Sequence, residues 1–464
     1  MLHLATALVA AGVHVTFLHT DHNTRRLDRA SAAAASPSPS PSPPRLRFLS
    51  VPDGLPEDHP RSVADLMELA KSLGAAASVA YRALLARMLT AGAPSHGDGD
   101  CVVFPPVTCV VADGVLPWGI DIAEELGVPA LAFRTSSACS FLAYLSVTNL
   151  FEIGKLPFPA GGDLDEPVRG VPGMESFLRR RDLPSSCRTS DENNDVVQLL
   201  AGVTAHSGTA RALVLNTAAS LERSALAHIT PHMRDVFAVG PLHAMSPAPA
   251  PASSLWREDD GCTAWLDGKA DRAVVYVSLG SLAVISHDQF TELFAGLVAA
   301  GYAFLWVLRP DMVDTGTDAV LQDAVSTVGD GSDVRIVPWA PQRDVLRHRA
   351  VGCFLTHCGW NSTLEAAVEG VPTVCWPFSA DQQINSRFVG AVWKTGLDMK
   401  DVCDRAIVEK MVREAMESGE IRASAQALAQ QLRRDVTDGG SSAKELDRLV
   451  RFIKKLSAPD ADSE

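Results

Sequence analysis

The chain has 464 residues, of which 47% are hydrophobic and 21% are charged, and its net charge at pH 7 is −14. This length exceeds what one ordinary hydrophobic core organises and predicts two domains. The acidic balance provides no electrostatic attraction to nucleic acid or to an anionic membrane, so we expect neither as a partner.

Nine cysteines are present, mostly inside apolar runs, as for Cys101, Cys109, Cys353 and Cys375. They form no CxxC pair and no metal-ligand spacing, so we expect no metal and buried thiols in a cytoplasmic protein. We also expect a monomer. No apolar run approaches the roughly 20 residues that cross a bilayer. Residues 1–18 are apolar but lack a basic leading region, so a signal peptide is the less favoured interpretation.

Several common catalytic motifs are missing from the sequence. It contains no HExxH, no GxSxG, no GxxxxGK[ST] and no GxGxxG. These absences argue against a zinc protease, an α/β-hydrolase, a P-loop enzyme and a nicotinamide-dependent enzyme.

The N-terminal stretch predicts a helix followed by a strand. Leu2, Ala5, Leu8 and Val9 recur at helical spacing, and Gly12 is a suitable residue just past a helix end. Residues 13–18 then have the pattern of a strand. The chain thus starts within a helix, although the first strand of a doubly wound sheet is usually central.

The rest of the first half alternates strands and helices, interrupted by loops. Residues 32–44 contain only Ala, Ser and Pro and predict a solvated loop, as do residues 93–100; residues 151–195 predict surface loop and short helices. Residues 45–56 predict a strand followed by the turn PDGLP. The remaining predicted elements are strands at 108–112, 129–133, 212–216 and 236–239, and helices at 63–89, 117–126 and 197–211.

Asp113 stands where the strand at 108–112 ends, before the next helix. Open α/β sheets bind ligands at the carboxyl ends of their strands, which favours a functional role for this carboxylate. The alternative is a structural cap, because Asp often accepts hydrogen bonds at the start of a helix.

The second half repeats the alternation after a Pro- and Ala-rich linker at residues 244–254. Such an alternation predicts parallel sheets covered by helices on both faces. The predicted elements are strands at 273–277, 304–308, 334–337, 351–355 and 371–376, and helices at 262–266, 288–300, 363–368, 381–392, 404–417, 421–435 and 443–456.

Residues 339–382 contain the most informative pattern. The strand at 351–355 is followed by the polar run Thr356–Ser362 and then by a helix. Backbone N–H groups at a helix start bind phosphate without a metal, so this turn is a candidate phosphate site. The alternative is a purely structural turn, in which Asn361 or Ser362 caps the helix and Glu365 completes a capping box.

This stretch of 44 residues resembles the donor-binding signature of plant UDP-dependent glycosyltransferases. The match covers Trp339, Gln342, the run from His357 to Ser362, Glu365 and the closing Asp381-Gln382. The resemblance implies an α/β protein of GT-B architecture, in which two Rossmann-like domains face a cleft. The expected division is residues 1–243 for acceptor binding, a linker at 244–254, residues 255–442 for UDP-sugar, and 443–464 with a helix returning to the first domain.

The resemblance also implies roles for individual residues. Trp339 would stack on uracil, beside Ala340; Gln342 would reach the uracil or ribose, and Glu365 would bind the ribose diol. Sites for the pyrophosphate and the sugar are implied at the following residues: His357, Asn361, Ser362 and Ser281 for the pyrophosphate; Trp360, Asp381, Gln382 and, from the first domain, Thr135 for the sugar. The closing Gln favours UDP-glucose as co-substrate, with no further cofactor.

The implied reaction is inverting transfer of glucose to a hydroxyl or carboxyl group of a small plant metabolite, such as a terpenoid, a phenolic, a flavonoid or a cyanohydrin. In the family a His base precedes a Pro-Met-Leu, and Asp113 would be its partner. Met1-Leu2 resembles the residues after that Pro, so we expect the base and its strand to be missing from this chain. Two alternatives are a UDP-sugar-binding protein with impaired catalysis, and a GT-B enzyme for another nucleotide sugar or a protein substrate. Arg134 stands where relatives commonly have a Trp.

Overall fold

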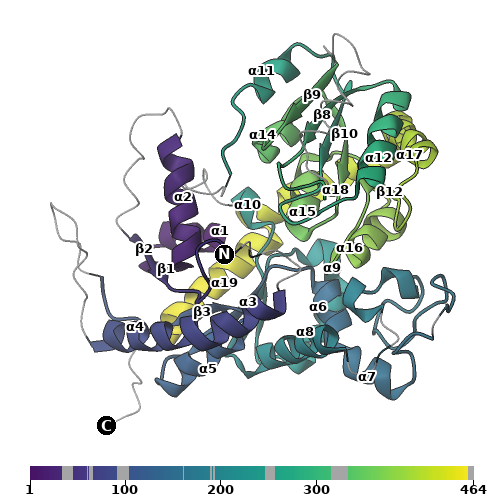
Figure 1. Cartoon of the computed structure of the whole chain (residues 1–464). Helices are drawn as coiled ribbons and strands as arrows, with labels where there is room; N and C mark the ends of the chain where they lie inside the picture. The colour runs from purple at the N-terminus through teal and green to yellow at the C-terminus, as the bar shows by residue number, and fades with distance from the viewer. Residues whose placement is uncertain are drawn as a thin grey trace. The chain divides into compact units, whose positions relative to one another are not determined.

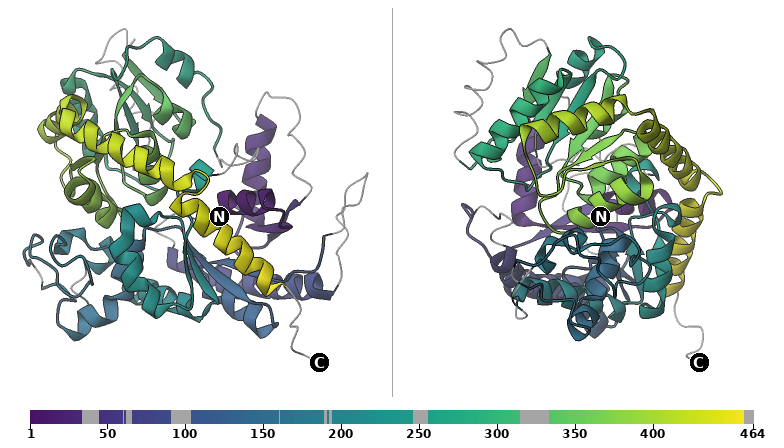
Figure 2. Two further views of the ribbon diagram at one scale, coloured as in Figure 1. Left: turned by 180° about the vertical axis from the view of Figure 1, so that it is seen from behind. Right: turned by 90° about the vertical axis from the view of Figure 1, so that its right-hand side faces the viewer.

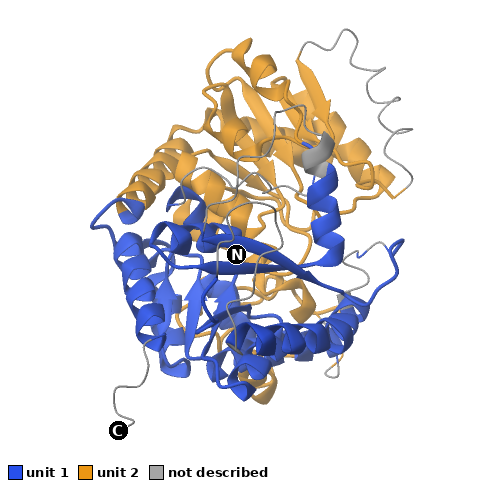
Figure 3. Ribbon diagram, turned by 90° about the vertical axis from the view of Figure 1, so that its left-hand side faces the viewer, with its two compact units in different colours: residues 1–145, 193–257, 435–464 blue, residues 146–192, 258–434 orange. Residues whose placement is uncertain are grey.

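The structure is a computed structural model that describes residues 1–33, 45–59, 61, 66–90, 104–159, 161–188, 191, 194–245, 256–314 and 333–457. Most of the predicted Ala/Ser/Pro loop, the loop at 93–100 and most of the linker at 244–254 lie outside these residues. The chain divides into two compact units (Figure 3). Unit 1 comprises residues 1–145, 193–257 and 435–464, and unit 2 comprises residues 146–192 and 258–434.

Unit 2 is built on a six-stranded parallel sheet with the order β12-β11-β10-β7-β8-β9. Counted from β7, this order is 3-2-1-4-5-6, the arrangement of a doubly wound nucleotide-binding fold. The order reverses between β7 and β10, which are direct neighbours. The strands are β7 (Val274–Ser278), β8 (Ala303–Val307), β9 (Val334–Val337), β10 (Val351–Thr356), β11 (Thr373–Cys375) and β12 (Gly396–Asp398).

Both faces of this sheet are covered, because successive side chains of a strand point to opposite sides. Val275 and Val277 join a core with helices α12 (His287–Ala300) and α17 (Arg405–Glu417), which lie side by side in Figure 1. Val274 and Tyr276 join a second core on the opposite face. The helices of that face are α11 (Cys262–Asp267), α14 (Gln342–Arg347) and α15 (Trp360–Glu369).

Residues 146–192 pack with unit 2, whereas the sequence-based division places them in the first domain. They contain α7 (Val147–Glu152) and the 3-10 turns η3 (Arg180–Asp182) and η4 (Ser185–Cys187). The remaining helices of this unit are α16 (Gln382–Arg387), the π-helix η7 (Phe388–Trp393) and α18 (Gly419–Val436), whose last residues belong to unit 1.

The strands of unit 1 form two separate parallel sheets. One has the order β3-β4-β5-β6, and the other contains β1 and β2 alone. The strands are β1 (Val15–Thr20), β2 (Leu46–Val51), β3 (Val110–Asp113), β4 (Ala130–Arg134), β5 (Ala212–Leu215) and β6 (Val236–Ala238).

The helix α1 (Leu2–Ala10) and the C-terminal helix α19 (Ser441–Leu456) share one core with the four-stranded sheet. Figure 2 shows α19 at the yellow end of the colour scale. The other helices of unit 1 are α2 (Asp21–Ala33), α3 (Leu66–Ser72), η2 (Leu73–Ala77), α4 (Ser78–Thr90), α5 (Pro117–Glu125), α6 (Ala138–Leu145), α8 (Asp195–His206), η5 (Ser207–Thr209), α9 (Ala219–Ile229), η6 (Thr230–His232) and α10 (Leu242–Met245). None of the described helices is long and apolar enough to span a bilayer.

The predicted strands are present, with ends that differ by a few residues. Two predicted helices were wrong in detail. The helix at 63–89 is interrupted by the π-helical segment η2, and the helix at 381–392 becomes the π-helix η7 after Arg387. The elements that the prediction missed include α2, α6, α9, α14 and the three-residue strand β12.

Candidate functional site

The sheet order of unit 2 locates the candidate site. In open α/β sheets a ligand binds at the carboxyl ends of the strands, where the strand order reverses. In unit 2 that point lies between β7 and β10, whose last residues, Ser278 and Thr356, are paired in register. The turns after them are residues 279–281, which include the expected site residue Ser281, and residues 357–359, which belong to the polar run Thr356–Ser362.

The two turns contact each other through His357. A Cβ atom at Gly280 would lie 2.5 Å from Cε1 and Nε2 of His357, and one at Gly359 would lie 2.5 Å from Nε2. Gly280 also has a φ of +77°, which side chains other than Gly rarely adopt. The imidazole therefore packs between two glycines, one in each turn, and its position depends on both.

His357 is neutral at physiological pH. Burial lowers the pKa of His357 to about 4; a backbone hydrogen bond with Ser278 opposes this shift, and the charge of Arg309 adds to it. Within the described residues, its Nδ1 is sealed from solvent and has no hydrogen-bond partner. A neutral imidazole contributes no positive charge to an anion.

A buried arginine supplies the positive charge that the sequence analysis missed. Arg309 follows β8, and 1% of its surface is exposed. Its guanidinium donates to the carbonyl oxygen of Gly280 at 2.5 Å and to that of Ala283 at 2.9 Å, and it forms an ion pair with Asp311 at 3.0 Å. Arg309 thus fixes the β7 turn through two of its carbonyl groups, while its charge is paired with Asp311.

Helix α15 starts earlier than predicted. Its first residue is Trp360, its N-cap is Gly359, and no side chain caps it. The structural alternative, in which Asn361 or Ser362 caps the helix and Glu365 completes a capping box, was therefore wrong. Asn361 is exposed in the first turn, where the backbone N–H groups have no partner within the helix. This end of α15 is available to an anion.

Glu365 is held by a polar network instead. Gln342 Nε2 donates to Glu365 Oε2 at 2.7 Å and to Ser362 Oγ at 3.0 Å, and Gln342 Oε1 accepts from the Tyr276 hydroxyl at 3.3 Å. Burial raises the pKa of Glu365, while the hydrogen bond from Gln342 opposes that change. Three predicted site residues therefore meet on α14 and α15, and one carboxylate oxygen, Oε1, has no hydrogen bond to Gln342.

Trp339 and Ala340 precede α14. Trp339 is half-buried and packs against the second core of unit 2, and Ala340 is 3% exposed. The carbonyl oxygen of Trp339 also accepts from the Asp259 backbone N–H at 2.9 Å. Trp339 thus contributes to this core and remains partly accessible.

A second group of predicted residues lies at the start of α16. Asn385 Nδ2 donates to Asp381 Oδ2 and to the carbonyl oxygen of Cys358, both at 3.0 Å. Gln382 Oε1 accepts from the backbone N–H groups of Phe378 and Ser379 at 2.7 and 3.0 Å. Asn385 therefore links the sugar-side turn to the β10 turn, and the Nε2 group of Gln382 is the part that a ligand can use.

Trp360 and Ser281 differ in exposure. Trp360 is 3% exposed, and its ring centroid lies 6.2 Å from that of Trp393, so its side chain belongs mainly to the packing beneath the site. Ser281 is exposed in the β7 turn, on the chain segment that Arg309 holds.

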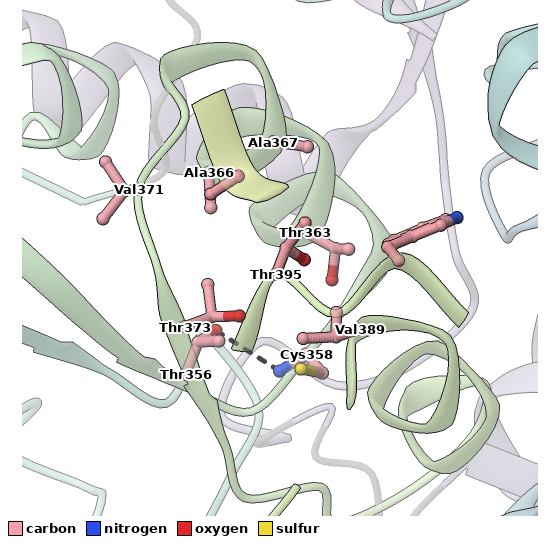
Figure 4. A pocket seen from close by; sticks show the side chains of 11 residues that line it. Thr356, Cys358, Thr363, Ala366, Ala367, Val371, Thr373, Val389 and Thr395 are labelled. Carbon is pink, nitrogen blue, oxygen red and sulfur yellow. Dashed lines mark hydrogen bonds between the residues drawn. The ribbon is translucent and has the colours of Figure 1, made fainter. Parts of the chain in front are cut away.

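A small cavity of about 10 Å³ lies behind the β10 turn (Figure 4). Its lining includes the hydroxyl-bearing residues Thr356, Thr363, Thr373 and Thr395, and the Oγ1 atom of Thr363 is buried without a hydrogen-bond partner within the described chain. This volume accommodates about one water molecule. The cavity is far too small for a nucleotide.

In unit 1, Asp113 is the last residue of β3, and Thr135 follows the neighbouring parallel strand β4. Asp113 Oδ1 accepts from the backbone N–H of Val115 at 3.1 Å, in the turn before α5. The N-cap of α5 is Leu116 and no side chain caps the helix, so Asp113 does not have the helix-capping role considered as its alternative. Thr135 is exposed. Arg134, between them, is buried and donates to the carbonyl oxygen of Gly114 at 2.9 Å and to Thr204 Oγ1 at 3.2 Å, so it ties the two strand ends together.

Glu222 is a further residue that the sequence analysis missed. It is 3% exposed and accepts from the backbone N–H groups of Ala138 and Cys139 at 2.9 and 2.8 Å, and from Thr217 Oγ1 at 2.5 Å. Glu222 thereby holds the start of α6, the helix that follows Thr135. No motif marks it, because its partners are backbone groups 84 and 83 residues away in sequence.

Comparisons with known proteins define the class. A sequence profile of the UDP-glucoronosyl and UDP-glucosyl transferase family matches residues 106–418. The chain therefore belongs to this family and is a plant family 1 UDP-glycosyltransferase with the GT-B fold. A UDP-sugar is its co-substrate, and among the described residues no group of three or more His, Cys, Asp or Glu could hold a metal ion.

Individual relatives align over nearly the entire chain. The myricetin 3-O-rhamnoside 1,2-glucosyltransferase of Crocosmia x crocosmiiflora is 42% identical over 100% of this chain and 94% of its own length. The 7-deoxyloganetic acid glucosyltransferase of Catharanthus roseus is 41% identical over 98% and 94%. The crystal structure of Os79 from O. sativa in complex with UDP has a TM-score of 0.76 at 25% identity, covering 98% of this chain and 96% of its own.

Proposed function

We propose that this protein transfers glucose from UDP-glucose to a hydroxyl or carboxyl group of a small plant metabolite, with inversion at the anomeric carbon. One observation carries the choice of glucose: the two relatives at 42% and 41% identity over practically the whole chain are both named glucosyltransferases. Glucosyltransferases for 7-deoxyloganetic acid and for a myricetin rhamnoside make an iridoid-like terpenoid and a flavonoid glycoside the acceptors to test first.

The donor side follows from the geometry of unit 2. The start of α15 and the turn held by Arg309 would receive the diphosphate, which suits free backbone N–H groups next to a buried cation. Glu365 would accept from the ribose hydroxyls, because Gln342 already fixes one of its oxygens at 2.7 Å. Asp381 and Gln382 would contact the glucose, and Trp339 would stack on the uracil.

In the proposed reaction the acceptor oxygen attacks the anomeric carbon while the bond to the UDP oxygen breaks on the opposite face. A hydroxyl acceptor gives its proton to a base, whereas a carboxyl acceptor is already ionised at neutral pH and needs none. The negative charge that develops on UDP is stabilised by Arg309 and by the start of α15. Asp113, at the end of β3, would act on the acceptor side as the partner of that base.

We further propose that the enzyme works in the cytoplasm as a monomer, without a nucleic-acid or membrane partner. Cysteine chemistry supports the choice of compartment: the eight cysteines of the described chain are free thiols, and burial raises the pKa of several of them, including Cys109 to about 12. Unreactive buried thiols suit a reducing compartment.

The test is a UDP-release assay with UDP-glucose and three acceptors: an iridoid acid, a flavonol rhamnoside and a cyanohydrin. Mass spectrometry identifies the product, and the anomeric coupling constant in its NMR spectrum reports inversion. Release of UDP with a β-glucoside product supports the proposal. Thermal stabilisation by UDP-glucose without transfer to any acceptor would favour the impaired UDP-sugar-binding alternative. Stronger stabilisation by another nucleotide sugar in the same thermal-shift measurement would favour a GT-B enzyme for that sugar.

A further inference from the structure

A short segment of unit 2 docks on the helix that carries the proposed glucose contacts. The segment spans residues 177–188 and includes η3 and η4. Phe177 packs edge-on against Phe388 with ring centroids 5.2 Å apart, and its carbonyl oxygen accepts from Arg387 Nε at 2.9 Å. Ser185 Oγ accepts from the backbone N–H of Ala380 at 3.1 Å. The segment therefore holds both ends of α16.

Asp182 is the centre of this contact. Its side chain is fully buried and forms a two-pronged pair with Arg179, at 2.9 Å to Nε and 3.0 Å to Nη2. Lys400 Nζ lies 2.9 Å from Asp182 Oδ1, and Arg387 Nε lies 3.4 Å from Oδ2. Burial alone raises the pKa of Asp182, but Arg179 and Lys400 outweigh it and hold that pKa below its ordinary value. Asp182 is therefore ionised at neutral pH.

Lys400 connects Asp182 to α16. An ammonium group has three N–H donors, and Lys400 has three acceptors within reach: Asp182 Oδ1 at 2.9 Å, Asp398 Oδ2 at 3.1 Å and the carbonyl oxygen of Gln383 at 2.8 Å. The Lys400 side chain is only 6% exposed. Without Asp182 the ammonium would lose its second carboxylate partner in a buried site, so its position would no longer be fixed.

Gln383 directly follows the two residues that would contact the glucose. Its carbonyl group lies in the first turn of α16, whose N-cap is Asp381. A shift of this turn would move Asp381 and Gln382 together, while leaving the distant network of Gln342 and Glu365 on α14 and α15 in place. The two halves of the donor site can therefore be disturbed separately.

We propose that Asp182 is a positioning residue for the donor sugar, acting through Lys400 and the carbonyl group of Gln383 to hold Asp381 and Gln382 in place. This inference rests on the proposed function, because it assumes that the start of α16 contacts glucose. It predicts a loss that is specific for the sugar: binding of UDP-glucose depends on Asp182, and binding of UDP does not.

The experiment measures the Kd of UDP and of UDP-glucose by calorimetry for the full chain and for Asp182→Asn. The expected result is a Kd for UDP-glucose that rises about tenfold, because the displaced Asp381 would lose one hydrogen bond with the sugar. The Kd of UDP should change less than about twofold. The KM for UDP-glucose should rise in parallel. The control is Asp401→Asn, which removes the ion pairs with Arg188 at 2.5 Å and Arg181 at 3.4 Å in the same segment, and should leave both Kd values unchanged.

Two further variants test the route through Lys400. Lys400→Gln should give the same loss as Asp182→Asn, and the double variant should be no worse than either, because residues that act through one contact are not additive. If Asp182→Asn fails to fold, Ser185→Ala is the milder change: it removes only the contact with Ala380 and should weaken UDP-glucose binding about threefold, again without affecting UDP.

Equal weakening of UDP and UDP-glucose, or no change in either for Asp182→Asn and Ser185→Ala, would overturn the inference while leaving the proposed function intact. A parent protein that binds neither UDP nor UDP-glucose would instead refute the proposed function. The same measurements thus separate the two failures.

Discussion

At the scale of single residues, Glu365 shows how the fold prepares a polar contact. Its carboxylate is half-buried, yet one oxygen is already hydrogen-bonded to Gln342. Burying a carboxylate is unfavourable unless hydrogen bonds compensate for the lost water, and a ribose diol supplies two such donors. Gln342 therefore holds the Glu365 carboxylate in position before a nucleotide binds.

Replacing Glu365 should weaken UDP binding more than any exposed substitution on α15. We expect the Kd of UDP to rise about tenfold for Glu365→Gln, which keeps one acceptor, and about a hundredfold for Glu365→Ala. Calorimetry at pH 7.5 measures both values. The control is Glu369→Gln on the same helix, whose ion pairs with Arg347 at 3.3 Å and Arg433 at 3.7 Å lie outside the network. An equal effect of Glu369→Gln would contradict the assignment.

His357 makes stability depend on pH on the acid side. Its pKa is about 4 in the folded protein and about 6.5 when unfolded, so below pH 6.5 the unfolded chain binds a proton that the folded one excludes. The stabilisation is complete above pH 6.5 and is lost as the pH falls to 4, by at most roughly 3 kcal/mol. Chemical denaturation between pH 4 and 7.5 should show a flatter profile for His357→Asn. An unchanged slope in that variant would assign the pH dependence to other groups.

At the scale of elements, the two turns after β7 and β10 act as one unit. Gly280 has φ +77°, its missing side chain leaves room for His357, and its carbonyl oxygen accepts from Arg309. These three constraints come from three different strand ends, β7, β10 and β8. The geometry of the phosphate turn is therefore specified by the neighbouring elements and not by the turn sequence alone.

Gly280→Ala should accordingly damage the site. A methyl group there would lie 2.5 Å from the imidazole and would force a residue with a side chain into φ +77°, at a cost of roughly 1–3 kcal/mol in stability. We also expect UDP affinity to fall about tenfold or more. Urea denaturation and calorimetry provide the measurements.

Gly202→Ala is the matched control, because Gly202 lies inside α8 with no atom near the added methyl group. It should stabilise the protein by about 0.5–1 kcal/mol, as expected when Gly in a helix becomes Ala. If Gly280→Ala behaved like Gly202→Ala, the contact between the two turns would contribute neither to stability nor to UDP binding.

At the scale of the whole molecule, the donor residues belong to a unit with its own sheet and two cores, one on each face. The site residues of unit 2 follow the ends of five strands, β7 to β11, and several lie on the helices that come after them. A ligand that connects these ends should therefore stabilise the entire sheet of unit 2, since unfolding the sheet requires releasing the ligand.

We expect UDP at 100 times its Kd to stabilise the protein by about 2.7 kcal/mol, with slower hydrogen exchange in β7, β10 and α15. Thermal denaturation with and without UDP, followed by hydrogen-exchange mass spectrometry, tests this expectation. Under the same concentrations Glu365→Ala should show almost no stabilisation. Protection confined to β3 and β4 would place the nucleotide in unit 1 and contradict the donor site described above.

The sequence by itself determined the alternation of strands and helices, the parallel sheets and the donor signature at residues 339–382. These features are readable because buried parallel strands are short apolar runs, and because the polar turns between them interrupt the pattern locally. The family profile and the relatives confirm the class of enzyme that this signature indicates.

Only the tertiary structure decided which polar groups meet. Arg309, Glu222 and Asp182 have no local signal, since each acts on partners far away in sequence: Gly280, Ala138 and Lys400. The alternative capping box of Ser362 and Glu365 was wrong because α15 already starts at Trp360, and both side chains bond instead to Gln342, 20 and 23 residues away. Apolar periodicity is a property of neighbouring residues, whereas a buried charge finds its partner only when the sheet and its helices have packed.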